Sequence, residues 1–556
     1  MDMRCTYRAG VVTLVVWTLA VPAMAQSVPG AAAASAGGRS ARPDAVTQEL
    51  RVDPLTLVSL EEAWRVADHL REEVFPAWDM RRTPVLIYRP GVQDVLINHA
   101  APPPGFRRWD GDLLPGADVF IRDDSTFLDV DDQNTFRTIE GHRTLIVADP
   151  ASRLRSQLAH TLTDRSREWA ERWLDEWGFL EPPYQDLLFL LHEGFHVYQA
   201  EATEKAMSMA AGARYPALDP DNRALLALEG RILKAAILAQ TPTDRLERAR
   251  QFVAVREDRR RRLDPVLVEY EDGTEFFEGL ASYVEYAFLG HASGLTPHPT
   301  MRYHRGFPGY GSALRERFAE KLERMVAATA ADDDRFGAGR YGLGPVRAAF
   351  YETGAAQGVL LDSLGAAWTE RIFEPGTSFT DLVRETVTAE GAEFAALLEA
   401  AAREHDYAEL RDRAVAFQRE AREWMAAEVD AILHPEGTRV TIDYSGYKRF
   451  ALRGFNPFGV TTVDAGTQIM RQPYFHAQFA EGIELHVRVP IPVLLQTERK
   501  KISFAVDLPG EAIALGSDGR IELDEFTLVA PGATIERDEE GVTIRLGPSA
   551  WRTTAR

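Results

Sequence analysis

Leu187-Leu-Phe-Leu-Leu-His192-Glu193-Gly-Phe-His196 is an apolar run followed by the pattern His-Glu-x-x-His. Its apolar periodicity predicts a helix. On a helix, His192 and His196 share one face, about 6 Å apart along the axis, so that two ring nitrogens can reach one Zn²⁺. Glu193 lies to the side of that pair, where it can hold a water on the metal and take its proton. Because histidines and a carboxylate beside an apolar run are costly to bury without a purpose, the stretch favours a zinc hydrolase site over a solvated helix face.

A catalytic zinc needs a third protein ligand and one open position. Residues 274–286 offer candidates in Thr-Glu-Phe-Phe-Glu-Gly-Leu-Ala-Ser-Tyr-Val-Glu-Tyr. This segment resembles the third-ligand helix of the aminopeptidase N family of gluzincins, roughly W-L-N-E-G-F-A-S-Y-V-E-Y. The resemblance implies that Glu278 is the third zinc ligand beside His192 and His196, and that Glu193 is the catalytic base.

Two further carboxylates, Glu275 and Glu285, lie one turn before and two turns after Glu278. They share roughly the same helix face. They are substitute ligands or hydrogen-bond partners of the ligands, although a surface position is the expectation for both.

A third segment, Phe350-Tyr351-Glu-Thr353-Gly, is similar to the Y-x-K-G segment of the same family, with Thr353 where that segment has lysine. The resemblance implies that the Tyr351 hydroxyl stabilises the oxyanion of the tetrahedral intermediate, a role that suits a phenol donor. Tyr341 and His304 are the alternatives for this role.

The chain departs from the family between its ligands. Residues 197–277, 81 in all, separate His196 from Glu278, which implies a helical insertion of about 63 residues within roughly 201–265. Such an insertion need not disturb the metal geometry, and it could form a lid over the cleft or a wall that limits substrate size. No G-x-M-E-N segment precedes the histidines. Glu140, in Thr-Ile-Glu-Gly-His, supplies a carboxylate near the expected edge strand but matches that segment poorly, so exo- or endopeptidase action is left open.

The balance of charges bears on the partners. The chain has 84 Asp and Glu against 63 Lys and Arg, for a net charge of -21. This acidic excess argues against a nucleic-acid partner. The basic run Arg259–Arg262 follows two acidic residues on a predicted helix, so we expect it to form a solvated charged face.

The first residues resemble an export signal. A short basic lead precedes an apolar run at residues 11–21, and Ala23-Met-Ala25 offers the small residues that a signal peptidase reads. We therefore expect cleavage before Gln26 and an exported, periplasmic or extracellular protein without stable membrane insertion. The only cysteine, Cys5, lies in the removed segment.

The chain is predicted to be an α+β multidomain protein. After a signal peptide (1–25) and a flexible linker (26–45), a β-rich module (46–152) precedes a helical body (153–434), which the resemblance implies is the zincin catalytic domain. Residues 435–556 alternate as strands do and predict a β-sandwich-like domain whose partner the sequence does not indicate.

Individual elements are also predicted. Short strands are expected at 84–88, 94–98, 118–122, 144–148, 439–443, 483–489, 502–506 and 541–545. Long helices are expected at 60–75, 154–177, 184–211, 222–240, 244–262, 276–289 and 389–433.

The function that these features favour is a secreted zinc metallopeptidase acting on a peptide or protein substrate. A zinc hydrolase of a small non-peptide compound is the second hypothesis. The third is a non-catalytic exported binding or scaffold protein that keeps a structural zinc. An acid-base residue beside the ligands counts against the third, because a structural site does not need one.

Overall fold

The structure is a computed structural model. It describes residues 48–123, 135–149, 185–203, 205, 209–212, 214–303, 314–329, 340–388, 393–454, 459–464, 466–471, 474–488 and 491–547. The predicted signal peptide and linker, and the predicted helix at 154–177, lie outside these residues. Within the described residues, no helix combines the length and the apolar character that crossing a membrane requires.

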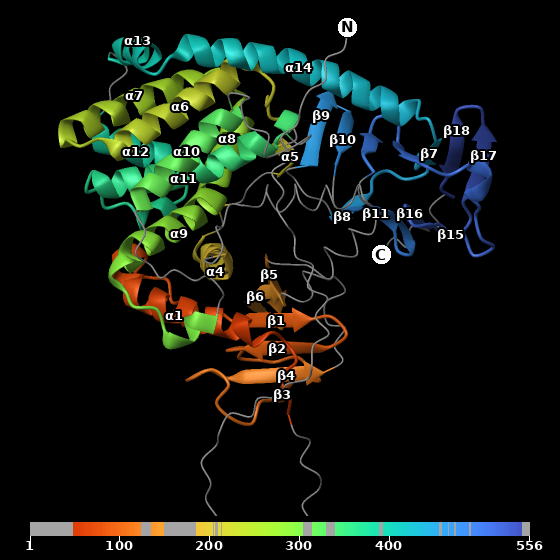
Figure 1. The fold of residues 1–556 in the computed structure, drawn as a ribbon, viewed down its shortest axis with the longest axis horizontal. Coiled ribbons are helices and arrows are strands. Elements are labelled where there is room, and N and C mark those ends of the chain that lie inside the picture. Colours follow the sequence, from red (N-terminus) through yellow and green to blue (C-terminus); the bar gives the residue numbers. More distant parts are fainter. Residues whose placement is uncertain are drawn as a thin grey trace, which may run out of the picture. The chain divides into compact units, whose positions relative to one another are not determined.

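The first elements are a helix and a six-stranded sheet (Figure 1). They are α1 Pro54–Val74, β1 Val85–Arg89, β2 Gln93–Ile97, β3 Arg107–Arg108, β4 Val119–Asp123, β5 Thr135–Ile139 and β6 His142–Ala148. The strand order is β3-β4-β2-β1-β6-β5, with β5 at one edge, and both β5 and β6 contact helix α4. Strands β1, β2, β4 and β6 confirm the four strands predicted here.

Alternation along these strands divides their side chains between two cores. Val85 and Ile87 pack into the main core of the molecule, whereas Leu86 and Tyr88 pack into a smaller cluster on the other face of the sheet. Successive residues of a strand point to opposite faces. Both faces of β1 are therefore buried, one against each core.

Helices dominate the middle of the chain. They are α4 Gln185–Ala202, α5 Met209–Gly212, α6 Pro220–Leu238, α7 Pro242–Arg260, α8 Pro265–Thr274, the π-helix η2 Glu275–Gly279, α9 Leu280–His291, α10 Leu314–Thr329, α11 Gly344–Ser363, α12 Phe379–Val387, α13 Phe394–Glu404 and α14 Tyr407–Leu433. Two predicted helices are shorter than expected. The helix predicted at 184–211 ends at Ala202. The helix predicted at 389–433 is divided at Asp406, because the left-handed backbone of that residue (φ +53°) does not fit a continuous helix.

The segment predicted as an insertion, residues 201–265, contributes to the core. Helix α6 buries Leu225, Leu226 and Ile232, and it contacts α7, α10, α11 and α14. Asp219 caps the start of α6, where Pro220 occupies the first turn. The described part of residues 201–265 thus packs into the helical region. The suggested role as a lid or a wall stays a prediction.

The prediction that Arg259–Arg262 form a solvated face is wrong for the first two residues. The Arg259 side chain is 0% exposed, and its guanidinium donates to Glu229 of α6 and to Glu271 of α8. Arg260 is also largely buried and donates to Glu271 at 2.9 Å. Acidic residues from two other helices satisfy these charges, so the run holds three helices together.

The last part of the described chain is all β. Its strands are β7 Thr438–Asp443, β8 Ala451–Gly454, β9 Val460–Asp464, β10 Thr467–Met470, β11 Tyr474–Ala480, β12 Ile483–Arg488, β13 Val493–Gln496, β14 Lys501–Val506, β15 Arg520–Glu522, β16 Phe526–Val529, β17 Thr534–Asp538 and β18 Gly541–Arg545. They form a seven-stranded sheet, β17-β18-β7-β14-β13-β10-β9, and a five-stranded sheet, β15-β16-β12-β11-β8.

One apolar core joins these two sheets. Ile502 and Phe504 from the first sheet share it with Phe475 and Leu485 from the second. The four strands predicted for this region are confirmed as β7, β12, β14 and β18. The C-terminal region therefore contains strands, as the sequence predicts.

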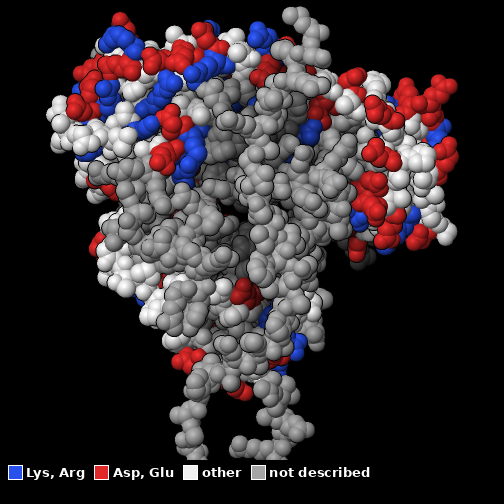
Figure 2. Space-filling view, in the orientation of Figure 1, with Lys and Arg blue, Asp and Glu red and all other residues white. Residues whose placement is uncertain are grey.

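Figure 2 shows charges of both signs along the top of the described face, where red and blue side chains lie next to one another over the helices α13 and α14. Arg413 and Glu409 of α14 are one such pair, at spacing i, i+4. With helices and sheets in separate parts of the chain, the protein is of the mixed α+β type that the sequence predicts.

Candidate metal centre

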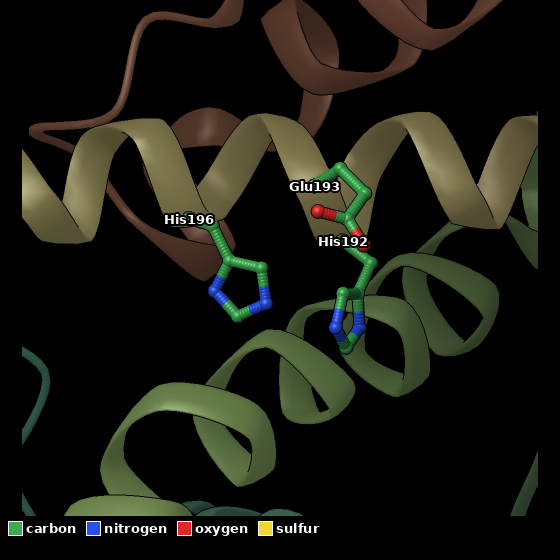
Figure 3. Close-up of side chains that lie close together, drawn as sticks. All are labelled: His192, Glu193 and His196. Carbon is green, nitrogen blue, oxygen red and sulfur yellow. The ribbon is translucent and has the colours of Figure 1, made fainter. Parts of the chain in front are cut away.

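Helix α4 carries two histidines at the spacing i, i+4. Leu187, Leu191 and Phe195 bury one side of this helix in the main core. Figure 3 shows the imidazoles of His192 and His196 pointing to the same side of α4. One ring nitrogen of each histidine and one carboxylate oxygen of Glu193 lie within 4.8 Å of one another.

A carboxylate from a distant helix meets both rings. The Oε2 atom of Glu278 lies 3.6 Å from Nε2 of His192 and 3.6 Å from Nε2 of His196. The three side chains are 15%, 13% and 12% exposed, so they are mostly buried yet open to solvent. The three ligands predicted from the sequence are therefore brought together from two helices, although 81 residues separate His196 from Glu278 in the chain.

These separations fit a tetrahedral zinc site. Ligand atoms at about 2.0–2.1 Å from a tetrahedral Zn²⁺ lie roughly 3.3–3.4 Å from each other. The two distances of 3.6 Å from Glu278 Oε2 exceed that by only a few tenths of an ångström. Two imidazole nitrogens and one carboxylate oxygen also form a donor set that zinc prefers.

Gln199 fixes the tautomer of His196. The Gln199 side-chain amide donates to the carbonyl oxygen of Phe276 at 2.7 Å, which orients its Oε1 toward His196 Nδ1, also at 2.7 Å. Since Oε1 can only accept, Nδ1 carries a proton, and the neutral form of the ring then has its lone pair on Nε2. A hydrogen bond of this kind orients a ligating histidine and raises its basicity.

Glu285 orients the ring of His192 in the same way as Gln199 orients that of His196. Its Oε1 atom accepts from His192 Nδ1 at 2.6 Å, which leaves Nε2 of that ring directed at Glu278. Glu285 is 6% exposed and Glu275 is 1% exposed, so the expectation that both lie at the surface is wrong. Glu285 is a hydrogen-bond partner of a candidate ligand, one of the roles that the sequence suggested for it.

Glu275 instead anchors the π-helix that contains Glu278. Its carboxylate accepts from Arg256 of α7, from Thr353 and, at 3.1 Å, from Gln357 of α11. Because π-helical turns mark positions where a side chain must be placed outside the α-helical register, this buried anchor sets where Glu278 points.

Helix α11 brings a cation and a phenol to the same carboxylate. Arg347 donates to Glu278 Oε1 at 2.9 Å, which leaves Oε2 for the histidine side. The Tyr351 hydroxyl lies 3.5 Å from the Arg347 guanidinium, and its ring lies nearly parallel to His192 with centroids 6.5 Å apart. Tyr351 thus lies beside the three candidate ligands.

A pair of glycines permits this approach. A Cβ on Gly279 would lie 2.7 Å from the Cα of Gly354, a distance that real Cβ atoms essentially never show. Only glycine at both positions lets the two backbones come so close. The contact places Glu278, next to Gly279, against the helix that contains Tyr351.

The charges of the site perturb one another. Although burial lowers the pKa of His192, hydrogen bonds with Glu278 and Glu285 raise it to about 10. Burial alone would raise the pKa of Glu278, but hydrogen bonds with both histidines hold that pKa well below its usual range. Burial raises the pKa of Glu193, and the two histidines oppose that rise. The site therefore has the strongly coupled acid and base groups that are common where chemistry occurs.

Tyr341 and His304 were the alternatives to Tyr351 for stabilising the oxyanion. The Tyr341 hydroxyl donates to Glu420 at 2.6 Å, and its ring packs on Phe417 and Trp424, so its contacts are with α14. His304 lies outside the described residues. Glu140 is exposed in the turn between β5 and β6.

Two residues of the site were missed by the sequence analysis. Gln199 lies three residues after His196, and Arg347 lies four residues before Tyr351, so each shares a helix face with a candidate site residue. This spacing is the one feature of the sequence that could have pointed to Gln199 and Arg347. It does not distinguish them from other polar residues, because their partners come from distant segments.

Known proteins do not place this chain in a family: no family model, no curated protein and no solved structure matches it. The geometry of the two helices is accordingly the basis for interpreting its function.

Proposed function

We propose that this protein is an exported zinc-dependent metallopeptidase of the gluzincin type, with Glu193 as its general base. One observation carries the proposal: Glu278 Oε2 is 3.6 Å from Nε2 of both His192 and His196. Gln199 and Glu285 accept hydrogen bonds from Nδ1 of His196 and His192, so that Nε2 of each ring faces that point. Such an arrangement is typical of a zinc site with an open position.

A zinc ion held by His192, His196 and Glu278 would supply a Lewis acid that polarises a peptide carbonyl and lowers the pKa of water. Glu193 takes the proton of the attacking water and then gives it to the leaving amine. Its carboxylate lies within 4.8 Å of the histidine nitrogens, which supports this role.

Tyr351 donates a hydrogen bond to the oxygen on which negative charge develops during attack. Its position beside His192 and Arg347 supports this role. Arg347 pairs with the other oxygen of Glu278 and thereby holds the carboxylate in one orientation.

The substrate is a peptide in an extended conformation. Among the described strands, β5 lies at the edge of its sheet, and it contacts α4, the helix that bears His192 and His196. An edge strand offers unpaired backbone groups to which an extended peptide adds as a further strand. The β5 edge would thus align a peptide alongside the candidate metal centre.

The test compares the zinc-loaded wild type with Glu193→Gln on a mixed peptide library, analysed by mass spectrometry. The wild type should yield fragments, whereas Glu193→Gln should retain zinc and yield none above background. Glu201→Gln, an exposed position at the end of the same helix, should behave as the wild type. Identical fragments from wild type and Glu193→Gln, or intact peptides with zinc-loaded wild type, would contradict the proposal.

Export is a separate part of the proposal. It predicts that protein recovered outside the cytoplasm begins at Gln26, which N-terminal sequencing measures. A mature chain that still contains residues 1–25 would contradict it.

A further inference from the structure

A second group of metal-ligating side chains lies on the five-stranded sheet of the C-terminal β region. Along β11, Phe475, Ala477 and Phe479 face the core. Along β12, Leu485 and Val487 face the same core. Because side chains alternate along a strand, the intervening residues project from the opposite face of the sheet. They are His476, Gln478, Glu484 and His486.

The pairing of the two strands brings three of these residues together. His476 is directly opposite His486 in the antiparallel register, and Glu484 is two residues before His486 on the same face. The imidazoles lie face to face, with ring centroids 3.7 Å apart and planes inclined by 24°. Glu484 Oε2 lies 3.3 Å from His476 Nε2 and 3.6 Å from His486 Nε2.

These distances match those of the candidate metal centre on α4. In both places one carboxylate oxygen lies 3.3–3.6 Å from two imidazole nitrogens. Tetrahedral zinc sets its ligand atoms roughly 3.3–3.4 Å apart. Gln478 donates to Glu484 Oε1 at 2.8 Å and so directs the other oxygen, Oε2, at the histidines.

The rings are stacked with their planes inclined by 24°, so a shared ion requires each imidazole to turn until its Nε2 lone pair points at the ion. Face-to-face aromatic pairs are less favourable than offset or edge-on pairs, and two histidinium ions at this distance would repel. Metal binding needs both imidazoles neutral, which removes the charge repulsion between them. The side chains of His476, Glu484 and His486 are 21%, 31% and 42% exposed, which leaves the group reachable from solvent.

We propose that His476, Glu484 and His486 bind a divalent transition-metal ion of the Zn²⁺ class on the outer face of this sheet. Imidazole and carboxylate ligands suit zinc and its first-row neighbours rather than Ca²⁺ or Mg²⁺. The ion would cross-link β11 and β12. The inference does not depend on the proposed peptidase activity, because the two groups share no residue.

The experiment counts Zn²⁺ bound to the full chain after metal removal and titration with zinc, using elemental analysis and a competing chromophoric chelator. The wild type should bind two ions. His486→Gln and Glu484→Gln should each bind one, with affinity for the lost ion at least about 100-fold weaker, because even outer hydrogen-bond partners of ligands contribute 10–100-fold. His434→Gln, a matched control at an exposed histidine paired with Asp430, should still bind two.

A background with His192→Gln and His196→Gln separates the two groups. There the β-sheet group should still bind one ion, and adding His486→Gln should abolish it. If His486→Gln binds as much zinc as the wild type, with equal affinity, the proposal is overturned. Circular dichroism confirms that each variant is folded, so a lost ion reports a lost ligand.

Discussion

Gly279 and Gly354 cross with their backbones in contact: a Cβ on Gly354 would lie 2.8 Å from the Cα of Gly279 and 2.8 Å from the carbonyl oxygen of Glu275. Neither neighbour is the end of a flexible side chain that could move aside. This crossing joins the π-helix of Glu278 to the helix of Tyr351. The two helices can lie this close only because the side chain at both crossing positions is a hydrogen atom.

Replacing Gly279 by alanine should therefore damage both stability and the site. Forced overpacking of a close helix contact costs about 1–3 kcal/mol in the free energy of unfolding. Urea unfolding measures that loss, and a zinc titration should show weaker binding because Glu278 is displaced. Gly294→Ala is the matched control, since the space around Gly294 is open. Equal stability of the two variants would show that the crossing is not tight.

Replacing Gln199 by leucine should weaken zinc binding by about 10–100-fold, the usual effect of removing a hydrogen-bond partner of a ligating histidine. The fully buried amide links His196 Nδ1 to the carbonyl of Phe276, and leucine makes neither bond. Chelator competition measures the affinity. Gln240→Leu, at an exposed glutamine, should bind zinc as the wild type does. Unchanged affinity in Gln199→Leu would contradict the role assigned to Gln199.

Replacing Tyr351 by phenylalanine should lower kcat by about 10²–10³ without changing zinc content, because the hydroxyl acts on charge that develops during the reaction. Peptide turnover and elemental analysis test this together. Tyr341→Phe loses a hydrogen bond to Glu420 and should keep full turnover. The reverse outcome, with Tyr341 essential and Tyr351 dispensable, would reassign the oxyanion role.

The buried ion network predicts a pH dependence of stability. Burial alone would raise the pKa of Glu271, but Arg259 and Arg260 lower it from 4.5 to about 2. A lowered folded-state pKa means that the charged form stabilises the fold above about pH 4.5, and that this contribution is lost as the pH falls toward about 2. Glu271→Gln should therefore be less stable than the wild type by about 3–5 kcal/mol at neutral pH.

The difference between wild type and Glu271→Gln should shrink as the pH falls below about 4.5, because protonation removes the same charge from the wild type. Urea unfolding at a series of pH values measures it. Glu409→Gln, at an exposed pair with Arg413, should differ from the wild type by less than about 1 kcal/mol. A difference for Glu271→Gln that does not vary with pH would contradict this account of the network.

Features of the structure that depend on residues close together in the chain were predicted from the sequence. The spacing of His192 and His196 places both rings on one side of α4 whatever the rest of the fold does. The four confirmed strands in each β region were predicted for a similar reason, because alternation and turn residues are features of short segments.

Contacts between distant segments could not be predicted in the same way. Arg259 looks like a surface charge until α6 and α8 bring Glu229 and Glu271 to it. The acceptor of Gln199 is the carbonyl of Phe276, which lies in the π-helix next to α8. Such partners are set by tertiary packing, and a polar residue on a helix carries no local mark of them.

The most direct test of the central claim is the position of the metal in crystals of the zinc-loaded protein, measured by anomalous scattering at the zinc absorption edge. The account predicts a peak within about 2.0–2.2 Å of His192 Nε2, His196 Nε2 and Glu278 Oε2. Density that contacts the histidines but leaves Glu278 paired only with Arg347, or no peak near α4 at all, would contradict it.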